Sequence, residues 1–208
     1  MSRNGAARVP RPGPCAVVIA CVIACASGAA SAEERKGSGL VIGVGAGLSG
    51  FTDRALRDGM SAQAGGLWSL RATAGSRLRV ALEIAYVFTA IGLEVPVPHA
   101  ASGTLIGSCL ESVLRINLRS QGPLAPYVFG GVGRQHYRLD RPNARIGHDA
   151  ELAVFPVGIG LAYRDPSGVI LELRATFRAA GAADFVVDGF GHGSLHAWDA
   201  SASLGYEL

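Results

Sequence analysis

The sequence predicts an all-β protein, an eight-stranded antiparallel up-and-down transmembrane β-barrel. Three observations lead to this prediction: apolar and polar side chains alternate along most of the chain, eight segments follow this alternation, and short turns alternate with long loops between them. Successive side chains of a β-strand point to opposite faces, so each segment has one apolar face and one small or charged face. Short turns at one rim and long loops at the other are typical of transmembrane β-barrels.

The chain begins with the features of a secretory signal peptide. Three arginines precede an apolar run at residues 15–26, and small residues then lead to Ala32. This order of basic, apolar and small-residue regions predicts export with cleavage after Ala32, and the apolar run is too short for a membrane-spanning helix. The predicted organisation is therefore a signal peptide at residues 1–32 and a barrel domain at residues 33–208.

Lipidation is an alternative to this cleavage. Residues 22–25, Val-Ile-Ala-Cys, resemble the lipobox of bacterial lipoproteins, in which the cysteine, here Cys25, becomes the lipidated first residue. Residues 18–21 fit the same pattern. Two loose matches within one apolar run favour chance, so signal peptidase cleavage is the preferred interpretation, and the predicted fold is the same in both cases.

Removal of the signal peptide changes the charge of the chain. The precursor has 19 Lys and Arg against 16 Asp and Glu, and the three arginines of the signal peptide account for the whole difference. The mature domain is formally neutral, which argues against nucleic acid as a partner. Three of the four cysteines also leave, so Cys109 alone makes neither an internal disulfide nor a metal cluster. The sequence predicts no metal and no cofactor.

The first three predicted strands are residues 40–48, 65–74 and 78–88. The first has large apolar side chains and one alanine on one face and mainly glycine on the other. The second places tryptophan, leucine and alanine opposite serine, arginine and threonine. The third alternates most clearly, since its large apolar side chains oppose a face that carries Arg79 and Glu83. A helix would scatter these charges into the apolar face, so a strand is predicted.

The next two predicted strands are residues 110–118 and 125–138. In the fourth, leucine, isoleucine and one serine face away from a side that carries Glu111 and Arg115. A loop with two prolines precedes this strand, and a Ser-Gln-Gly-Pro turn ends it. The fifth segment is rich in glycine and aromatic residues, and the alternation does not assign its faces.

The last three predicted strands are residues 152–163, 169–178 and 195–208. A short Asp-Pro-Ser-Gly turn joins the sixth to the seventh, whose apolar face opposes two arginines and a glutamate. A glycine-rich loop at residues 179–193 leads to the eighth. The eighth segment has one apolar face and ends at Leu208, so we expect it to pair with the first strand and close the barrel.

The assignment of the two faces distinguishes a membrane barrel from a soluble one. The apolar face points inward in a soluble barrel and toward lipid in a membrane barrel. The apolar faces of the third, fourth and seventh strands carry no charge, which favours the membrane assignment. Charged residues of the opposite faces then lie in the lumen: Arg71, Arg79, Glu83, Glu111, Arg115, Glu172, Arg174, Arg178, Asp199 and Glu207.

An eight-stranded barrel is just wide enough for side chains to fill it. We therefore expect these charges to pair across the interior and to leave little or no open channel. The alternative is that they form an ordinary solvated face. The protein would then be a soluble or lipid-anchored periplasmic barrel whose apolar interior binds a small hydrophobic ligand.

Two stretches of the chain resemble a known family. Residues 123–133, Pro-Leu-Ala-Pro-Tyr-Val-Phe-Gly-Gly-Val-Gly, are similar to a glycine-rich strand of the small OmpA-like outer-membrane β-barrels. Residues 156–163 and 171–174 resemble the next hairpin of that family. The resemblance implies an eight-stranded barrel in the outer membrane of a diderm bacterium, in contact with outer-membrane lipid.

The same resemblance implies that the outer-membrane assembly machinery recognises the last strand. Members of the family usually end in Phe or Trp, whereas this chain ends in Leu208. Leu204 and Tyr206 keep the alternate spacing of the apolar face. The C-terminal assembly strand is therefore predicted to present Leu204, Tyr206 and Leu208.

Two motifs point to cofactor binding or catalysis, and neither is preferred. Residues 45–50 fit the dinucleotide fingerprint G-x-G-x-x-G, but neither a helix nor an acid about twenty residues later follows. His192 and Ser194 resemble the His-x-Ser site of lipid A deacylases, in which histidine activates serine. A glycine-rich loop supports such geometry poorly. The expected function is a non-enzymatic structural or loop-mediated role with an unidentified loop partner, and a deacylase-like esterase is the third alternative.

Overall fold

The computed structural model describes residues 39–52, 64–93, 103–119, 122–140, 149–181, 186–187, 191–192 and 195–208. The chain divides into two units, Met1–Lys36 and Gly37–Leu208. The first unit lies outside the described residues, and so do the predicted cleavage site after Ala32 and the alternative lipidation site at Cys25. In the described part of the chain, no helix is long and apolar enough to cross a membrane.

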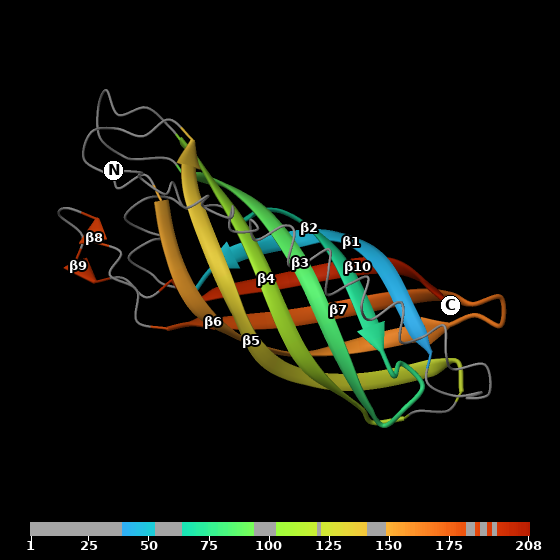
Figure 1. Cartoon of the computed structure of the whole chain (residues 1–208). Helices are drawn as coiled ribbons and strands as arrows, with labels where there is room; N and C mark the ends of the chain where they lie inside the picture. The colour runs from blue at the N-terminus through green and yellow to red at the C-terminus, as the bar shows by residue number, and fades with distance from the viewer. Residues whose placement is uncertain are drawn as a thin grey trace, which may run out of the picture. The chain divides into compact units, whose positions relative to one another are not determined.

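Eight long strands of the described residues form one closed antiparallel barrel, in the order β1-β10-β7-β6-β5-β4-β3-β2 (Figure 1). Their bounds are β1 Leu40–Phe51, β2 Gly65–Ala74, β3 Val80–Leu93, β4 Gly103–Asn117, β5 Leu124–Asp140, β6 Asp149–Arg164, β7 Val169–Ala180 and β10 Ala197–Glu207. Two further strands, β8 Val186–Val187 and β9 Gly191–His192, pair with each other in a separate sheet. The predicted all-β, eight-stranded, up-and-down barrel is confirmed.

The first and last strands close the barrel. β1 and β10 run antiparallel from the pair Val41 and Glu207 to the pair Phe51 and Ala197. This pairing leaves no edge strand in the barrel, so the backbone groups of β1 and β10 have partners on both sides. The prediction that the last segment pairs with the first is confirmed.

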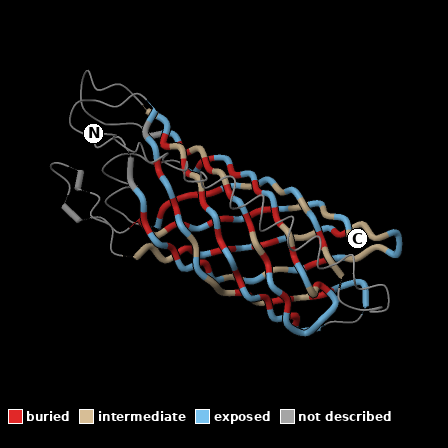
Figure 2. Tube along the Cα trace, viewed as in Figure 1, coloured by how far each residue is buried: buried red, intermediate tan, exposed pale blue. Residues whose placement is uncertain are grey.

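Buried and exposed residues alternate along the strands (Figure 2). Leu173 is 62% exposed, whereas Arg174, the next residue of β7, is 4% exposed. Large apolar side chains point outward in all eight long strands. The charged side chains of β2, β3, β4, β7 and β10 point inward, whereas Arg134, Arg138 and Glu151 of β5 and β6 are exposed. The exposed fractions therefore give the barrel an apolar outer surface and an interior that contains buried charges, an arrangement typical of membrane barrels.

Four neighbouring strands, β3 to β6, extend past the ends that the alternation predicts, on the side of the long loops (Figure 1). β4 begins at Gly103 rather than at residue 110, and it pairs there with Leu93 of β3. Thr104 and Ser108 occupy outward positions in this extension. The apolar alternation ends there while the backbone pairing continues, which is why the sequence pattern gives strands that are too short.

The short connections lie at the other rim, because successive strands alternate in direction. Residues 75–79 form the turn between β2 and β3, so β3 begins at Val80 and not at residue 78 as predicted. Gly75 and Gly168 have φ values of 80° and 91°, a left-handed conformation that glycine adopts without a steric cost. At the long-loop rim, the predicted loop at residues 179–193 contains the short strands β8 and β9.

Apolar residues in the interior form two clusters. One gathers toward the long-loop ends of the strands and contains Phe51, Leu67, Ala85, Val87, Ile91, Leu105, Cys109, Tyr137, Leu152, Val154, Leu195 and Ala197. The other lies toward the short turns and contains Val41, Val113, Ala125, Tyr127, Phe129, Ala162 and Ile170. The inward charged side chains are interspersed with these clusters, and they form the candidate site.

Candidate functional site

The inward positions of five strands carry four arginines and four carboxylates among the described residues. β2 supplies Arg71, β3 supplies Glu83, β4 supplies Glu111 and Arg115, β7 supplies Glu172, Arg174 and Arg178, and β10 supplies Asp199 as the fifth strand of the set. All of them except Glu172 are buried, and Glu172 is intermediate. Opposite charges are thus present in equal number, so each buried charge can have a partner of the opposite sign, as buried charges require.

Arg178 forms the first group of ion pairs, with two carboxylates. Its Nη2 lies 3.1 Å from Glu111 Oε1, and its Nε lies 3.2 Å from Glu111 Oε2. The remaining Nη1 donates to Asp199 Oδ2. One guanidinium therefore joins β4, β7 and β10 across the interior, and its fork geometry matches the carboxylate of Glu111.

Glu83 is the centre of the second group. It accepts a hydrogen bond from Arg174 Nη1, and a second from Thr73 Oγ1 at 3.3 Å. Arg71 Nε lies 4.0 Å from Glu83 Oε1, at the limit of an ion pair and beyond a hydrogen bond. Glu83 itself is 0% exposed, so these contacts replace the water that its carboxylate loses on burial.

Arg115 forms the third group, with Glu172 and Asn117. Its Nη1 lies 2.5 Å from Glu172 Oε1, and its Nε donates to Asn117 Oδ1 at 2.9 Å. Asn117 in turn donates from Nδ2 to the carbonyl oxygen of Leu78 at 2.6 Å, in the turn between β2 and β3. The charge network therefore reaches from the middle of the barrel to its short-turn end.

Two aromatic rings of β5 pack against these guanidiniums. Arg115 Cζ lies 3.5 Å from the ring centroid of Tyr127, and Arg174 Cζ lies 3.5 Å from that of Phe129. Such cation–π contacts are strengthened where water is excluded. Tyr127 and Phe129 were not predicted as site residues, because the alternation does not assign the faces of this strand.

Glycines of β6 make room for both rings. A Cβ atom on Gly160 would lie 2.2 Å from Tyr127 Cζ, and one on Gly158 would lie 2.5 Å from Phe129 Cζ. Tyr127 is paired with Gly160, and Phe129 with Gly158, in the register of β5 and β6. The sequence did contain a signal for the inward face. Aromatic residues occupy alternate positions of β5, and glycines occupy the opposite alternate positions of β6.

Glu207 lies at the short-turn mouth of the barrel rather than in its middle. Its Oε1 accepts a hydrogen bond from Ser76 Oγ at 2.8 Å, and its carboxylate accepts two from Arg77, at 2.9 Å from Nε and 2.6 Å from Nη2. These hydrogen bonds raise the pKa of Arg77. The last strand is thereby joined to the first short turn.

The structure places the other predicted residues as follows. Arg79 is exposed and lies in the turn before β3, so the prediction that it lies in the lumen is wrong. The reason is that β3 begins at Val80, so Arg79 precedes the strand.

The remaining predicted residues lie at the end of β10 and in the loop before it. Leu204, Tyr206 and Leu208 lie on the outward side and are 53, 53 and 71% exposed. The side chain of His192 and all of Ser194 lie outside the described residues.

Aromatic residues on the outer surface are found toward both ends of the apolar belt. Trp68 stacks on Phe88 with ring centroids 5.6 Å apart, and Trp198 lies near the same long-loop end of β10. Tyr206 lies near the short-turn end of that strand. Eight residues separate Trp198 from Tyr206, which is about 27 Å along a strand and roughly 20 Å along the axis of a tilted barrel.

Charge pairing is the main interaction of the interior carboxylates. The carboxylates of Glu83, Glu111 and Glu172 each contact an arginine in the interior. In the described part of the chain, no group of three or more His, Cys, Asp and Glu side chains is arranged to hold a metal ion. The site is therefore best described as a network that fills the barrel.

Solved structures with the same fold are known. No protein-family model and no curated protein matches the sequence. Neisserial surface protein A, from Neisseria, is similar with a TM-score of 0.60 and 11% identity over 81% of this chain and 97% of that one. Ail, the attachment invasion locus protein of Yersinia pestis, solved with the heparin analogue sucrose octasulfate, has a TM-score of 0.52 and 10% identity over 82% of this chain and 99% of its own. The fold is that of the small eight-stranded outer-membrane β-barrels.

Proposed function

We propose that this chain is a non-enzymatic outer-membrane protein of a diderm bacterium, exported through a cleaved signal peptide. Its barrel crosses the bilayer in contact with outer-membrane lipid, its short turns face the periplasm, and its long loops face outward. The interior is sealed by side chains, and the role is structural or depends on a partner that the loops bind.

The outward apolar belt is the observation that carries this proposal. Val44, Leu114 and Leu173 are each at least 51% exposed, and they lie on β1, β4 and β7, which are spaced around the closed barrel. Soluble monomers rarely expose contiguous apolar patches of more than a few hundred Å². A surface that is apolar all round the barrel and bounded by aromatic residues matches the lipid-facing surface of an outer-membrane barrel.

Burial of the interior supports the absence of an open pore. Glu83, Glu111, Arg115 and Tyr127, which project from three neighbouring strands, are at most 2% exposed. An open aqueous channel would leave such side chains accessible. In a planar bilayer we expect no stable conductance steps from the purified protein, and a steady large conductance would contradict the sealed interior.

The soluble alternative is not favoured. A periplasmic barrel that binds a small hydrophobic ligand requires an apolar interior with a cavity of several hundred Å³. Here most large apolar side chains lie outside, and charged side chains occupy the interior between its two apolar clusters. The esterase alternative depends on His192 and Ser194, and Ser194→Ala tests it directly. We expect this change to leave the acylation pattern of lipid A in mass spectra unaltered, and restored acyl chains would contradict a non-enzymatic role.

Mobility on a denaturing gel tests the main proposal. A folded outer-membrane barrel resists the detergent, so we expect the unboiled protein to migrate faster than the boiled protein and to sediment with the outer membrane. A protein that stays soluble without detergent after signal removal would contradict the membrane assignment. The mass of the mature chain separates cleavage after Ala32 from lipidation at Cys25, since only the second adds acyl chains.

Recognition of the last strand by the assembly machinery is the second part of the proposal. Leu204, Tyr206 and Leu208 form the apolar outward face at the end of β10. We expect Tyr206→Ala to reduce the amount of heat-modifiable barrel in the outer membrane and Leu208→Phe to increase or preserve it. Unchanged assembly of Tyr206→Ala would contradict a recognition role for this strand.

A binding role of the loops is supported by one similar structure. Ail, a barrel of the same fold, was solved in complex with a heparin analogue. We therefore propose that cells displaying this chain bind a partner through its long connections. Replacement of residues 141–148 by a glycine-serine linker is expected to keep the heat-modifiable barrel and to weaken binding to immobilised heparin. Equal binding by cells that lack the protein would contradict this part of the proposal.

A further inference from the structure

Arg71 is the one arginine of the interior network without a carboxylate at hydrogen-bond distance in the described structure. Its nearest ion-pair contact is Glu83 Oε1 at 4.0 Å from Nε, and its Nη2 lies 3.4 Å from Ser201 Oγ. Nε and Nη1 have no hydrogen-bond partner among the described residues, although Arg71 is only 6% exposed. A buried donor without an acceptor is unfavourable, so this guanidinium requires a further partner.

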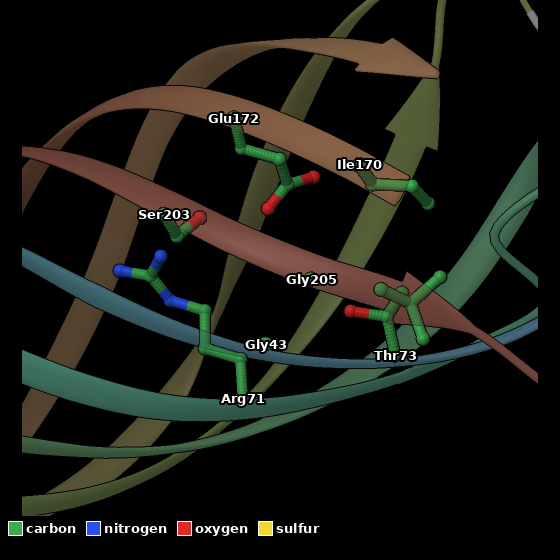
Figure 3. Close-up of a pocket in the computed structure, with 8 residues that line it drawn as sticks. Gly43, Arg71, Thr73, Ile170, Glu172, Ser203 and Gly205 are labelled. Carbon is green, nitrogen blue, oxygen red and sulfur yellow. The ribbon is translucent and has the colours of Figure 1, made fainter. Parts of the chain in front are cut away.

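A small cavity adjoins the guanidinium. It has a volume of about 10 Å³, and it is lined by Val41, Gly43, Arg71, Thr73, Ile170, Glu172, Ser203 and Gly205. In Figure 3, the guanidinium of Arg71 and the carboxylate of Glu172 extend toward each other from β2 and β7, with Ser203 of β10 between them. The space exists because Gly43 and Gly205, at inward positions of β1 and β10, have no side chains.

We infer that this cavity binds one water molecule, which accepts a hydrogen bond from Arg71 and donates to Glu172 and Ser203. A volume of roughly 10 to 15 Å³ with two to four polar partners is the requirement for one buried water. Water accepts and donates, as the pairing of a guanidinium with a carboxylate demands. An anion of this size would meet the negative charge of Glu172, and a cation would meet that of Arg71.

The water completes a chain of contacts across the middle of the barrel. Arg174 donates to Glu83, and Glu83 lies beside Arg71. The water then links Arg71 to Glu172, and Glu172 accepts from Arg115. With this link, Arg71, Arg115 and Arg174 all interact with carboxylates, directly or through one water. The site also explains the inward glycines at the seam of β1 and β10, because a larger side chain would occupy the position of the water.

A double-mutant cycle tests the inference, with the full protein extracted from outer membranes in detergent. Gly43→Ala adds a methyl group that displaces the water; its Cβ would lie 3.2 Å from the carbonyl oxygen of Leu204, with backbone atoms as its three nearest neighbours. We expect the temperature at which the gel shift is lost to fall by several degrees. In an Arg71→Met background, which has no donor to leave unpaired, the same change is expected to have a clearly smaller effect.

The cycle removes the contribution of backbone crowding, since that contribution is the same in both backgrounds. An equal fall in the temperature of gel-shift loss in both backgrounds would overturn the inference, and so would a rise in that temperature in the background that keeps Arg71.

A crystal structure at high resolution is the second measurement. We expect a solvent peak within 3.5 Å of both Arg71 and Glu172 and no anomalous signal there after a bromide soak. A bromide peak, or no peak at this position beside other ordered waters, would overturn it.

Discussion

Glu207, at the end of the last strand, accepts hydrogen bonds from both Nε and Nη2 of Arg77, at 2.9 and 2.6 Å. Arg77 lies in the turn between β2 and β3, so this contact joins the C-terminal strand to the first short turn across β1. Ser76 Oγ donates to the same carboxylate, and Leu208 N donates to the carbonyl oxygen of Leu40. The seam between the terminal strands is therefore fixed at its short-turn end by side chains as well as by the backbone.

Removal of the Arg77 side chain is expected to have a small effect. The Arg77 side chain is 59% exposed and that of Glu207 is 7% exposed, so solvent screens the ion pair on one side. We expect Arg77→Ala to lower the free energy of unfolding by about 0.5 to 1 kcal/mol. Urea titration of the heat-modifiable band measures it, and 1 M salt is expected to reduce the difference from the wild type. A loss of several kcal/mol would show that the pair is not screened.

Gly160 is expected to tolerate no larger side chain while Tyr127 is present. A Cβ atom there would lie 2.2 Å from Tyr127 Cζ, so Gly160→Ala must displace a ring that is 1% exposed. Overpacking of this kind costs about 1 to 3 kcal/mol. Gly66→Ala is the matched control, because a Cβ on Gly66 has no atom within 4 Å.

Gel mobility and urea titration measure both variants. We expect the loss in Gly160→Ala to be partly recovered in a double variant with Tyr127→Leu, whose smaller side chain lies farther from residue 160. A stability of Gly160→Ala equal to that of Gly66→Ala would contradict the packing of Tyr127 against this strand.

The fold was accessible from the sequence because the outer surface and the interior of a membrane barrel impose opposite demands on alternate residues. β2 has the predicted bounds, and the pairing of β1 with β10 follows from the same alternation. The extensions of β3 to β6 were not accessible, because residues such as Thr104 lie outside the apolar belt and their outward side chains no longer need to be apolar. Arg79 was assigned to the lumen for a related reason: a period of two gives a residue's side of the strand and does not indicate where the strand begins.

The candidate site was predictable in composition and not in geometry. Alternation alone identifies the inward charges Glu83 and Arg174, but only the barrel register brings β3 and β7 within reach of each other across the interior. The rings of Tyr127 and Phe129 were missed because both faces of β5 mix apolar and polar residues. The inward face carries the rings with glycines and Gln135, and the outward face carries valines with two arginines. The contact that places these rings in the interior is made with the glycines of β6. This contact lies between two strands, so the alternation within one strand does not reveal it.

Loss of the Glu83 carboxylate is expected to be far more costly than loss of a surface carboxylate. Glu83 is 0% exposed and contacts Arg174 and Arg71, which would remain buried without compensation. We expect Glu83→Gln to lower the free energy of unfolding by about 3 to 5 kcal/mol. Glu151→Gln is the control, because the side chains of Glu151 and its partner Arg134 are 47 and 74% exposed, and its effect is expected to be at most about 1 kcal/mol.

Both variants are compared by urea titration of the folded band, with pulse labelling to detect a barrel that fails to assemble. If Glu83→Gln has the same stability as Glu151→Gln, the interior charges do not depend on one another. A double variant, Glu83→Gln with Arg174→Met, removes one buried charge of each sign and is expected to recover part of the loss.

A charge in the middle of the outward belt tests the membrane assignment most directly. Leu173 is 62% exposed and pairs with Ala202, halfway along β10 between the levels of Trp198 and Tyr206. In a bilayer, Leu173→Arg is expected to cost about 2 to 4 kcal/mol, because the guanidinium would lie near the hydrocarbon midplane. In water, the same change on an exposed surface would have almost no effect.

Ala153→Arg is the matched control for this variant. Ala153 is also exposed and faces outward, but it lies toward the long-loop end of β6, between Glu151 and Phe155, where the belt meets polar residues. The cost near the interface falls to about 0 to 1 kcal/mol, so we expect nearly normal assembly. The measurement is the fraction of heat-modifiable protein folded into lipid vesicles at increasing urea. A depth-dependent difference between the two arginines requires a hydrocarbon layer around the barrel, whereas equal and small effects would place this surface in water.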